Sequence, residues 1–194
     1  MKKLMSLMLA LTMLAAVAAG CAGNGNEGTT DTTGTSAQAP ASALEVLTNI
    51  WAKFTENEKF PVYGGDAENM VTDAPGSYNL QDTESLNVQL LVPADQAKNV
   101  TEAAALFHGM MSNNFSSGVF RIAQDASAFA DKMHDAVKNA RWMCGMPEKA
   151  VIAVIGGEYV VMAFGLKDVI DPFQAKLTEA YPDAQIKYAV DITG

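Results

Sequence analysis

The chain is poor in cysteine and in basic side chains. It contains only two cysteines, and 13 lysine and arginine residues stand against 22 aspartate and glutamate residues. Two cysteines are too few for a disulfide-stabilised scaffold. The formal net charge of −9 argues against nucleic acid as a partner, because phosphate binding needs clustered lysine and arginine. A hydrophobic content of 49% excludes disorder throughout, and 194 residues suit one domain with a tail.

Motifs of known catalytic sites are also missing. The sequence has neither a Gly-x-Ser-x-Gly elbow nor a His-Glu-x-x-His pair, and Gly64-Gly65 and Gly156-Gly157 lack the lysine and hydroxyl residue of a P-loop. Acidic residues between positions 66 and 82 lack the spacing of an EF-hand, so a solvated loop is expected there. We therefore expect no enzyme activity, no cofactor and no resident metal.

The first twenty residues have the composition of a secretory signal peptide. Lys2 and Lys3 precede a mostly apolar run, which ends in small residues. The run has about 16 residues, whereas a bilayer span needs about 20. Ala18-Ala19-Gly20-Cys21 resembles a bacterial lipobox, in which the cysteine receives a diacylglycerol group and becomes the new N-terminus. The resemblance implies that residues 1–20 are removed and that Cys21 carries fatty acid such as palmitate.

Residues 22–41 are dominated by glycine, threonine and alanine. Such a stretch buries too little surface to fold, and a flexible coil of twenty residues reaches about 25 Å. The predicted organisation is a signal peptide (1–20), a lipidated cysteine with a disordered tether (21–41) and one folded domain (42–194). The predicted location is the outer face of the bacterial cytoplasmic membrane.

The first folded element is predicted to be a helix that begins after Ser42. Leu44, Leu47, Trp51 and Phe54 recur at the spacing of one helix face, and Ser42 is a suitable N-cap. The Pro- and Gly-containing stretch at 60–83 predicts loops or very short strands. Further helices are expected at 83–91, 125–140 and 168–181, and strands at 115–123, 151–155, 159–164 and 186–190. Three consecutive alanines give residues 100–111 a helix propensity, but the turn-forming residues that follow favour a strand there.

The clearest local pattern is a hairpin around Gly156-Gly157. The flanking strands are hydrophobic without alternation, so both of their faces should be covered. Hairpin and helix follow each other twice along the chain. The predicted fold class is α+β, an antiparallel sheet with the two later helices on one face and the N-terminal helix on the other.

Several segments resemble small secreted lipoproteins of Gram-positive anaerobes, some of which are labelled bacteriocin transport accessory protein. The matching stretches are Asn49-Ile50-Trp51-Ala52, Gly64-Gly65-Asp66, Asn69-Met70-Val71, Asp73-Ala74-Pro75-Gly76, Arg141-Trp142-Met143-Cys144-Gly145, Tyr159-Val160-Val161 and Ala180-Tyr181-Pro182-Asp183-Ala184. The resemblance covers most of the chain and brings no catalytic motif. Its label implies a thioredoxin-like protein.

The stretch from Trp142 to Pro147 has a superficial likeness to the thioredoxin motif Trp-Cys-Gly-Pro-Cys. Thiol exchange needs an attacking and a resolving cysteine, but Pro147 stands three residues after Cys144. With Cys21 acylated, Cys144 is the single thiol of the mature chain. Two interpretations stay open for Cys144, a buried structural cysteine or a possible thiol that forms a mixed disulfide with a partner.

Thioether and thiolate side chains are the ligands that a soft metal such as copper(I) prefers. The candidate ligands are His108, Met110, Met111, Met143, Cys144 and Met146. On a strand, His108 and Met110 share a face and Met111 points to the other. We therefore expect the methionines to fill the core and predict no metal site.

Three aromatic residues, Trp51, Tyr63 and Trp142, are predicted to line a possible ligand groove. The order of lipid anchor, tether and domain, together with the missing catalytic motifs, indicates a non-enzymatic lipoprotein that acts as a partner- or ligand-binding module of the cell envelope. Its predicted partners are membrane lipid, through acylated Cys21, and an unknown envelope protein or peptide. The alternative is a redox or transport accessory protein that acts through Cys144.

Overall fold

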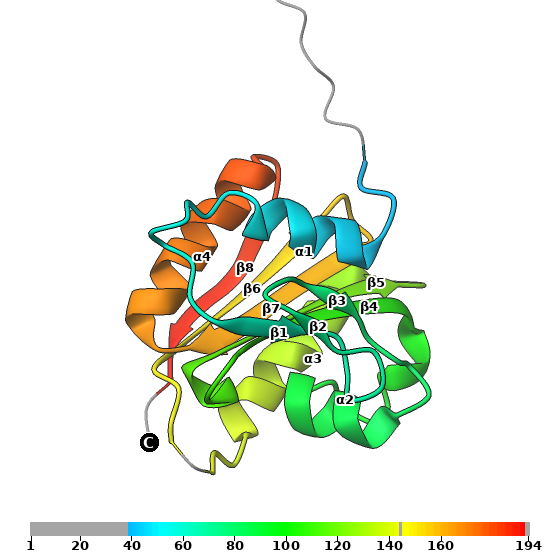
Figure 1. The fold of residues 1–194 in the computed structure, drawn as a ribbon. Coiled ribbons are helices and arrows are strands. Elements are labelled where there is room, and N and C mark those ends of the chain that lie inside the picture. Colours follow the sequence, from blue (N-terminus) through cyan, green and yellow to red (C-terminus); the bar gives the residue numbers. More distant parts are fainter. Residues whose placement is uncertain (1–38, 144, 193–194) are drawn as a thin grey trace, which may run out of the picture. The chain divides into compact units, whose positions relative to one another are not determined.

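An antiparallel sheet of eight strands forms the centre of the computed structural model, which describes residues 39–143 and 145–192 (Figure 1). The strand order is β2-β1-β4-β5-β7-β6-β8, and β3 also pairs with β4. The strands are β1 (Val62–Gly64), β2 (Val71–Thr72), β3 (Gly76–Ser77), β4 (Val100–His108), β5 (Phe115–Ile122), β6 (Lys149–Ile155), β7 (Tyr159–Gly165) and β8 (Gln185–Asp191). The predicted signal peptide, Cys21 and Cys144 lie outside the described residues.

Four α-helices cover the sheet in the part of the chain that is described. They are α1 (Ala43–Trp51), α2 (Thr83–Leu90), α3 (Ala126–Asn139) and α4 (Lys167–Ala180). The predicted α+β class with an antiparallel sheet is confirmed, and each predicted helix is present. None of these helices is both long and apolar enough to cross a bilayer.

Side-chain caps explain where three of the helices begin. Ser42 accepts a hydrogen bond from the Glu45 amide at 3.1 Å, as predicted, and Asp82 and Asp125 cap α2 and α3 in the same way. Helix α4 has no cap of its own. Instead the Glu148 carboxylate accepts a hydrogen bond from the Lys167 amide at 2.9 Å.

The domain begins slightly earlier than predicted, inside the last residues of the expected tether. The Tyr159 hydroxyl donates a hydrogen bond to the Pro40 carbonyl, and the Ala41 amide donates one to the Glu45 carboxylate. Residues 40 and 41 are therefore attached to the sheet and to α1.

Alternate side chains of the central strands enter two separate cores. The α3-side core lies under α2 and α3 and includes Leu86, Phe120, Phe129, Met133, Ile152 and Met162. The α4-side core lies under α1 and α4 and includes Leu47, Ile50, Phe115, Val161, Phe173 and Leu177. Both faces of β6 and β7 are thus covered, which confirms the interpretation of their continuous hydrophobicity.

The prediction that the two later helices share a face is wrong. Helix α3 packs on one face of the sheet and α4 on the other (Figure 1). The reason is the strand order. The β5-α3-β6 and β7-α4-β8 connections each step two positions in the same direction along the sheet, but β5 and β7 are antiparallel. Right-handed crossovers from oppositely directed strands place their helices on opposite faces.

Candidate functional site

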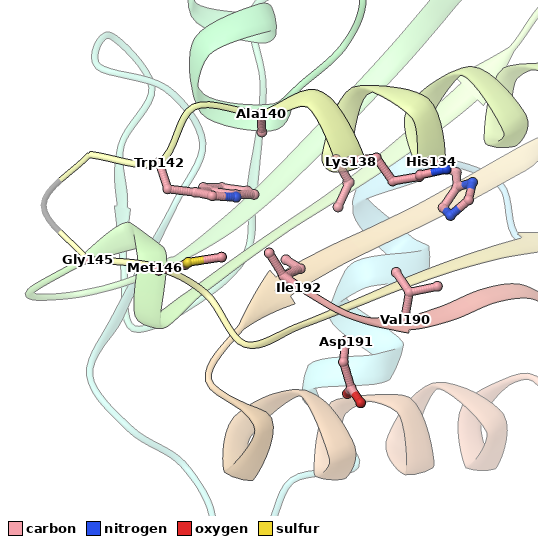
Figure 2. A pocket seen from close by; sticks show the side chains of 10 residues that line it. His134, Lys138, Ala140, Trp142, Gly145, Met146, Val190, Asp191 and Ile192 are labelled. Carbon is pink, nitrogen blue, oxygen red and sulfur yellow. The ribbon is translucent and has the colours of Figure 1, made fainter. Parts of the chain in front are cut away.

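A groove lies between the C-terminal half of α3, the connection that follows it and the end of β8 (Figure 2). Its volume is about 850 Å³. The described residues that line it are His134, Val137, Lys138, Ala140, Trp142, Gly145, Met146, Val190, Asp191 and Ile192. Most of this wall is apolar, so the groove suits a ligand with an apolar body.

Trp142 forms one end of the groove. Helix α3 ends because Ala140 adopts an extended conformation, and the chain then turns across the sheet. The indole ring packs on Phe164 of β7 with ring centroids 5.0 Å apart, and its side chain is half-buried against the α3-side core. Figure 2 shows Trp142 and Met146 at the same end of the space that Val190 and Ile192 border from β8.

Two hydrogen bonds attach this connection to the turn before β5. The Asn113 side-chain amide donates to the carbonyl oxygens of Met143 and Gly145, both at 2.7 Å. Gly145 has a φ of 118°, which an L side chain rarely adopts. The position of Trp142 and Met146 therefore depends on polar contacts just outside the groove.

Polar groups are few in the groove and have different surroundings. His134 stacks on Tyr188 with ring centroids 3.9 Å apart, and the Tyr188 hydroxyl donates a hydrogen bond to Asp131. That hydrogen bond raises the pKa of Tyr188. Lys138 makes no salt bridge with any carboxylate among residues 39–143 and 145–192. Its ammonium group can therefore bind an anionic part of a ligand.

The three aromatic residues predicted to share a groove do not meet. Trp51 is only 6% exposed in the α4-side core, where it contacts Phe54 and Phe60. Tyr63 stacks on Phe107 at the other side of the sheet and lines a different hollow. Of the three, only Trp142 lines the groove described above. Trp51 lies on the other face of the sheet, whereas Tyr63 lies on the same face as Trp142 but on β1, far from β8 in the strand order.

The hollow beside Tyr63 contains three of the methionines considered as soft-metal ligands. Met110, Met111 and Met143 line it together with His108, while Met146 belongs to the groove. All four methionines are exposed, so the expectation that they fill the core is wrong. The prediction that Met110 and Met111 point to opposite faces of a strand is wrong. Strand β4 ends at His108, so the alternation of side chains stops before these two residues. His108 Nδ1 accepts a hydrogen bond from the Met110 amide, which orients the ring. Within the described ranges, no three His, Cys, Asp or Glu residues form a group that could hold a metal ion.

Acidic residues of the middle segment have structural contacts. Asp82 caps α2, and Asp66 accepts hydrogen bonds from three backbone amides, those of Glu68, Asn69 and Asn79. These contacts do not bring two carboxylates together for acid–base chemistry.

Sequence reasoning missed Lys138, Val190 and Ile192 as groove residues. The signal available was the alternation of β8, which places Tyr188, Val190 and Ile192 on one side. Comparisons with family models, with curated proteins and with solved structures return no match for this chain.

Proposed function

We propose that this protein is a lipid-anchored binding protein of the bacterial cell envelope, and that its ligand occupies the groove at Trp142. The observation that carries the proposal is the apolar groove with an aromatic ring at one end and a lysine without a described partner on its wall. Binding is favoured over catalysis because, among the described residues, the wall offers only His134, Lys138 and Trp142 as hydrogen-bonding side chains, since the Asp191 carboxylate points away from the groove.

The membrane anchor is proposed from the leader sequence. Lys2 and Lys3, the apolar run and Cys21 at the end of small residues have the order of a lipoprotein signal. The chain has a negative formal net charge of −9, so anionic lipid would repel the domain. The acyl groups would therefore hold it at the membrane. The expected location is the outer face of the cytoplasmic membrane.

Radiolabelled palmitate tests the anchor. The wild-type chain should incorporate the label and fractionate with membranes, and the Cys21→Ala variant should do neither. Label on the Cys21→Ala variant, or an unlabelled wild-type chain with its leader intact in the cytosol, would contradict the proposed anchor.

Intrinsic fluorescence tests the groove. Trp51→Phe leaves Trp142 as the single tryptophan, and Trp142→Phe leaves buried Trp51 as the matched control. The full chain is reconstituted into phosphatidylcholine vesicles and titrated with 4-phenylbutyrate, which combines an apolar body with a carboxylate. We expect a saturable spectral change in Trp51→Phe and none in Trp142→Phe. Equal responses of the two variants, or no response in either, would contradict ligand binding at the groove.

A further inference from the structure

We propose that the ligand of the groove is an extended peptide with a free C-terminal carboxylate, and that it adds to the free edge of β8 as a further strand. This inference rests on the proposed function, because it names the class of ligand that the Trp142 groove binds. Three features carry it, namely an unpaired strand edge, an apolar groove beside that edge and a lysine on the groove wall.

The outer edge of β8 has no strand partner among residues 39–143 and 145–192. Within these ranges, β8 ends the sheet and pairs with β6 alone. The Ile192 amide donates to the Glu148 carbonyl at 2.8 Å, so Ile192 faces β6. Because ladder hydrogen bonds alternate along an antiparallel strand, Asp191 and Ala189 direct their N–H and C=O groups outward. These groups are available to an added strand.

Only the first half of this edge is protected against pairing. The pairing register of β6 and β8 shifts near Lys187. The Lys187 ammonium group donates a hydrogen bond to the Ser127 hydroxyl at 2.8 Å and lies 3.7 Å from an Asp131 carboxylate oxygen. A bulge and a lysine are common devices that prevent edge-to-edge association. The second half, which borders the groove, contains neither device, and Ala189 and Asp191 are exposed there. An incoming strand therefore meets open backbone next to the groove.

Side-chain direction joins the edge to the groove. Tyr188, Val190 and Ile192 point to the α3 side, where Val190 and Ile192 line the groove, whereas Figure 2 shows Asp191 turned away from it. In a strand added beside β8, every second side chain lies on the α3 side as well. Those side chains would enter the groove and approach Trp142 and Met146. Main-chain pairing with pockets for alternate side chains is an established mode of peptide recognition.

Lys138 selects among peptides. It lies in the last turn of α3 and lines the groove with an exposed side chain, and its ammonium group can form a charge-assisted hydrogen bond with an anion. The C-terminal carboxylate of a peptide supplies that anion, so the peptide needs no charged side chain in the apolar groove. A fatty acid would also offer a carboxylate, but it has no backbone N–H and C=O groups that could pair with those of Ala189 and Asp191.

The test uses a pool of fluorescein-labelled octapeptides and the full chain in phosphatidylcholine vesicles. Every second position of the pool is a mixture of Val, Leu, Ile and Phe, the others are Ser or Thr, and the C-terminus is free. Fluorescence anisotropy should rise in a saturable manner with the wild-type chain. An identical pool with C-terminal amides should bind at least tenfold more weakly.

Two pairs of variants separate the contributions of edge and lysine. Ala189→Pro removes an outward N–H without removing a hydrogen bond to β6, and it should weaken binding at least tenfold, whereas Ala189→Thr should bind within twofold of wild type. Lys138→Met should abolish the preference for the free carboxylate. Lys132→Met is its control, because Lys132 lies on the same helix and lines a different hollow.

Methylated peptides keep the test valid if Ala189→Pro misfolds. Methyl groups on alternate backbone nitrogens block one edge of a strand. Two peptide pools are therefore compared, one methylated at the odd positions and the other at the even positions, and only one of them should lose binding to the wild-type chain. Equal binding of both pools, no binding of any pool, or a β8-dependent dimer that excludes the peptides would overturn the proposal. If the pools fail while 4-phenylbutyrate still alters Trp142 fluorescence, the peptide inference falls and the proposed binding function stands.

Discussion

At the residue scale, one carboxylate organises the segment between β1 and α2. Asp66 accepts hydrogen bonds from the amides of Glu68, Asn69 and Asn79, the last at 2.6 Å. Burial alone would raise the pKa of Asp66, but these hydrogen bonds and one from the Asn69 side chain outweigh it and lower the pKa below its ordinary value of 3.8. A carboxyl group with a lowered pKa stabilises the fold when ionised.

We therefore predict that Asp66→Asn lowers the free energy of unfolding at pH 7 by about 1–2 kcal/mol, since an amide cannot satisfy the same donors. The folded pKa lies below the unfolded one, so this contribution is fully present above the unfolded value. It is lost as the pH falls below 3.8 through the folded value. Urea unfolding at pH 7 and at low pH measures the difference between wild type and variant, which should shrink in acid. Asp73→Asn, in the same segment, is the control; a loss there as large as that of Asp66→Asn would contradict the assignment.

A second residue-scale prediction concerns the ring of Phe173. It is fully buried in the α4-side core, and its centroid lies 5.3 Å from that of Phe115. Phe173→Ala should lower the free energy of unfolding by about 3–5 kcal/mol, because it removes apolar contact and leaves a cavity. Urea denaturation measures this loss. A change below about 0.5 kcal/mol is typical of surface positions and would show that the ring is not in the core.

At the element scale, the ends of the helices were easier to predict than their placement. Ser42 is a recognisable cap because its side-chain oxygen can reach an amide three residues later, a local contact that the sequence encodes directly. The sheet face that a helix covers depends instead on strand order, a long-range property. For this reason the sequence predicts the helices at 126–139 and 167–180 but not that they cover opposite faces of the sheet.

The candidate groove illustrates the same limit. Trp142 lines the groove, but its neighbours Val190 and Ile192 lie 48 and 50 residues later in the chain and meet it only through the β6–β8 pairing. Trp51 was grouped with Trp142 because both are large and aromatic. Its spacing with Leu47 on α1 instead indicated a core residue, which the structure confirms.

For an element-scale prediction, α3 offers a matched pair of aspartates. The Asp125 carboxylate accepts a hydrogen bond from the Ala128 amide at 2.9 Å, so Asp125→Ala should lower the free energy of unfolding by about 1 kcal/mol. Asp135→Ala removes the same charge from the same helix without removing a cap. Thermal or urea unfolding of both variants compares them. Equal losses would mean that charge, and not the cap, accounts for the effect of Asp125.

At the scale of the whole molecule, the sheet separates two cores that share strands but not side chains. Phe129 belongs to the α3-side core and Phe173 to the α4-side core, whereas Phe115 contacts Phe173 directly. The groove borders the α3-side core alone, since Trp142, Val190 and Ile192 all pack against it. Changes in the α4-side core should therefore alter stability with little effect on the groove.

This arrangement predicts additivity across the sheet and coupling within one core. Phe129→Leu and Phe173→Leu should each lower the free energy of unfolding by about 1–2 kcal/mol. Their double variant should equal the sum within about 0.5 kcal/mol, because residues without shared partners act independently. Phe115→Leu combined with Phe173→Leu should depart from additivity by more than this, since the two rings are in contact. Urea unfolding of the single and double variants measures the coupling free energy of each pair. A coupling between Phe129 and Phe173 as large as that between Phe115 and Phe173 would show that the sheet does not isolate its two faces.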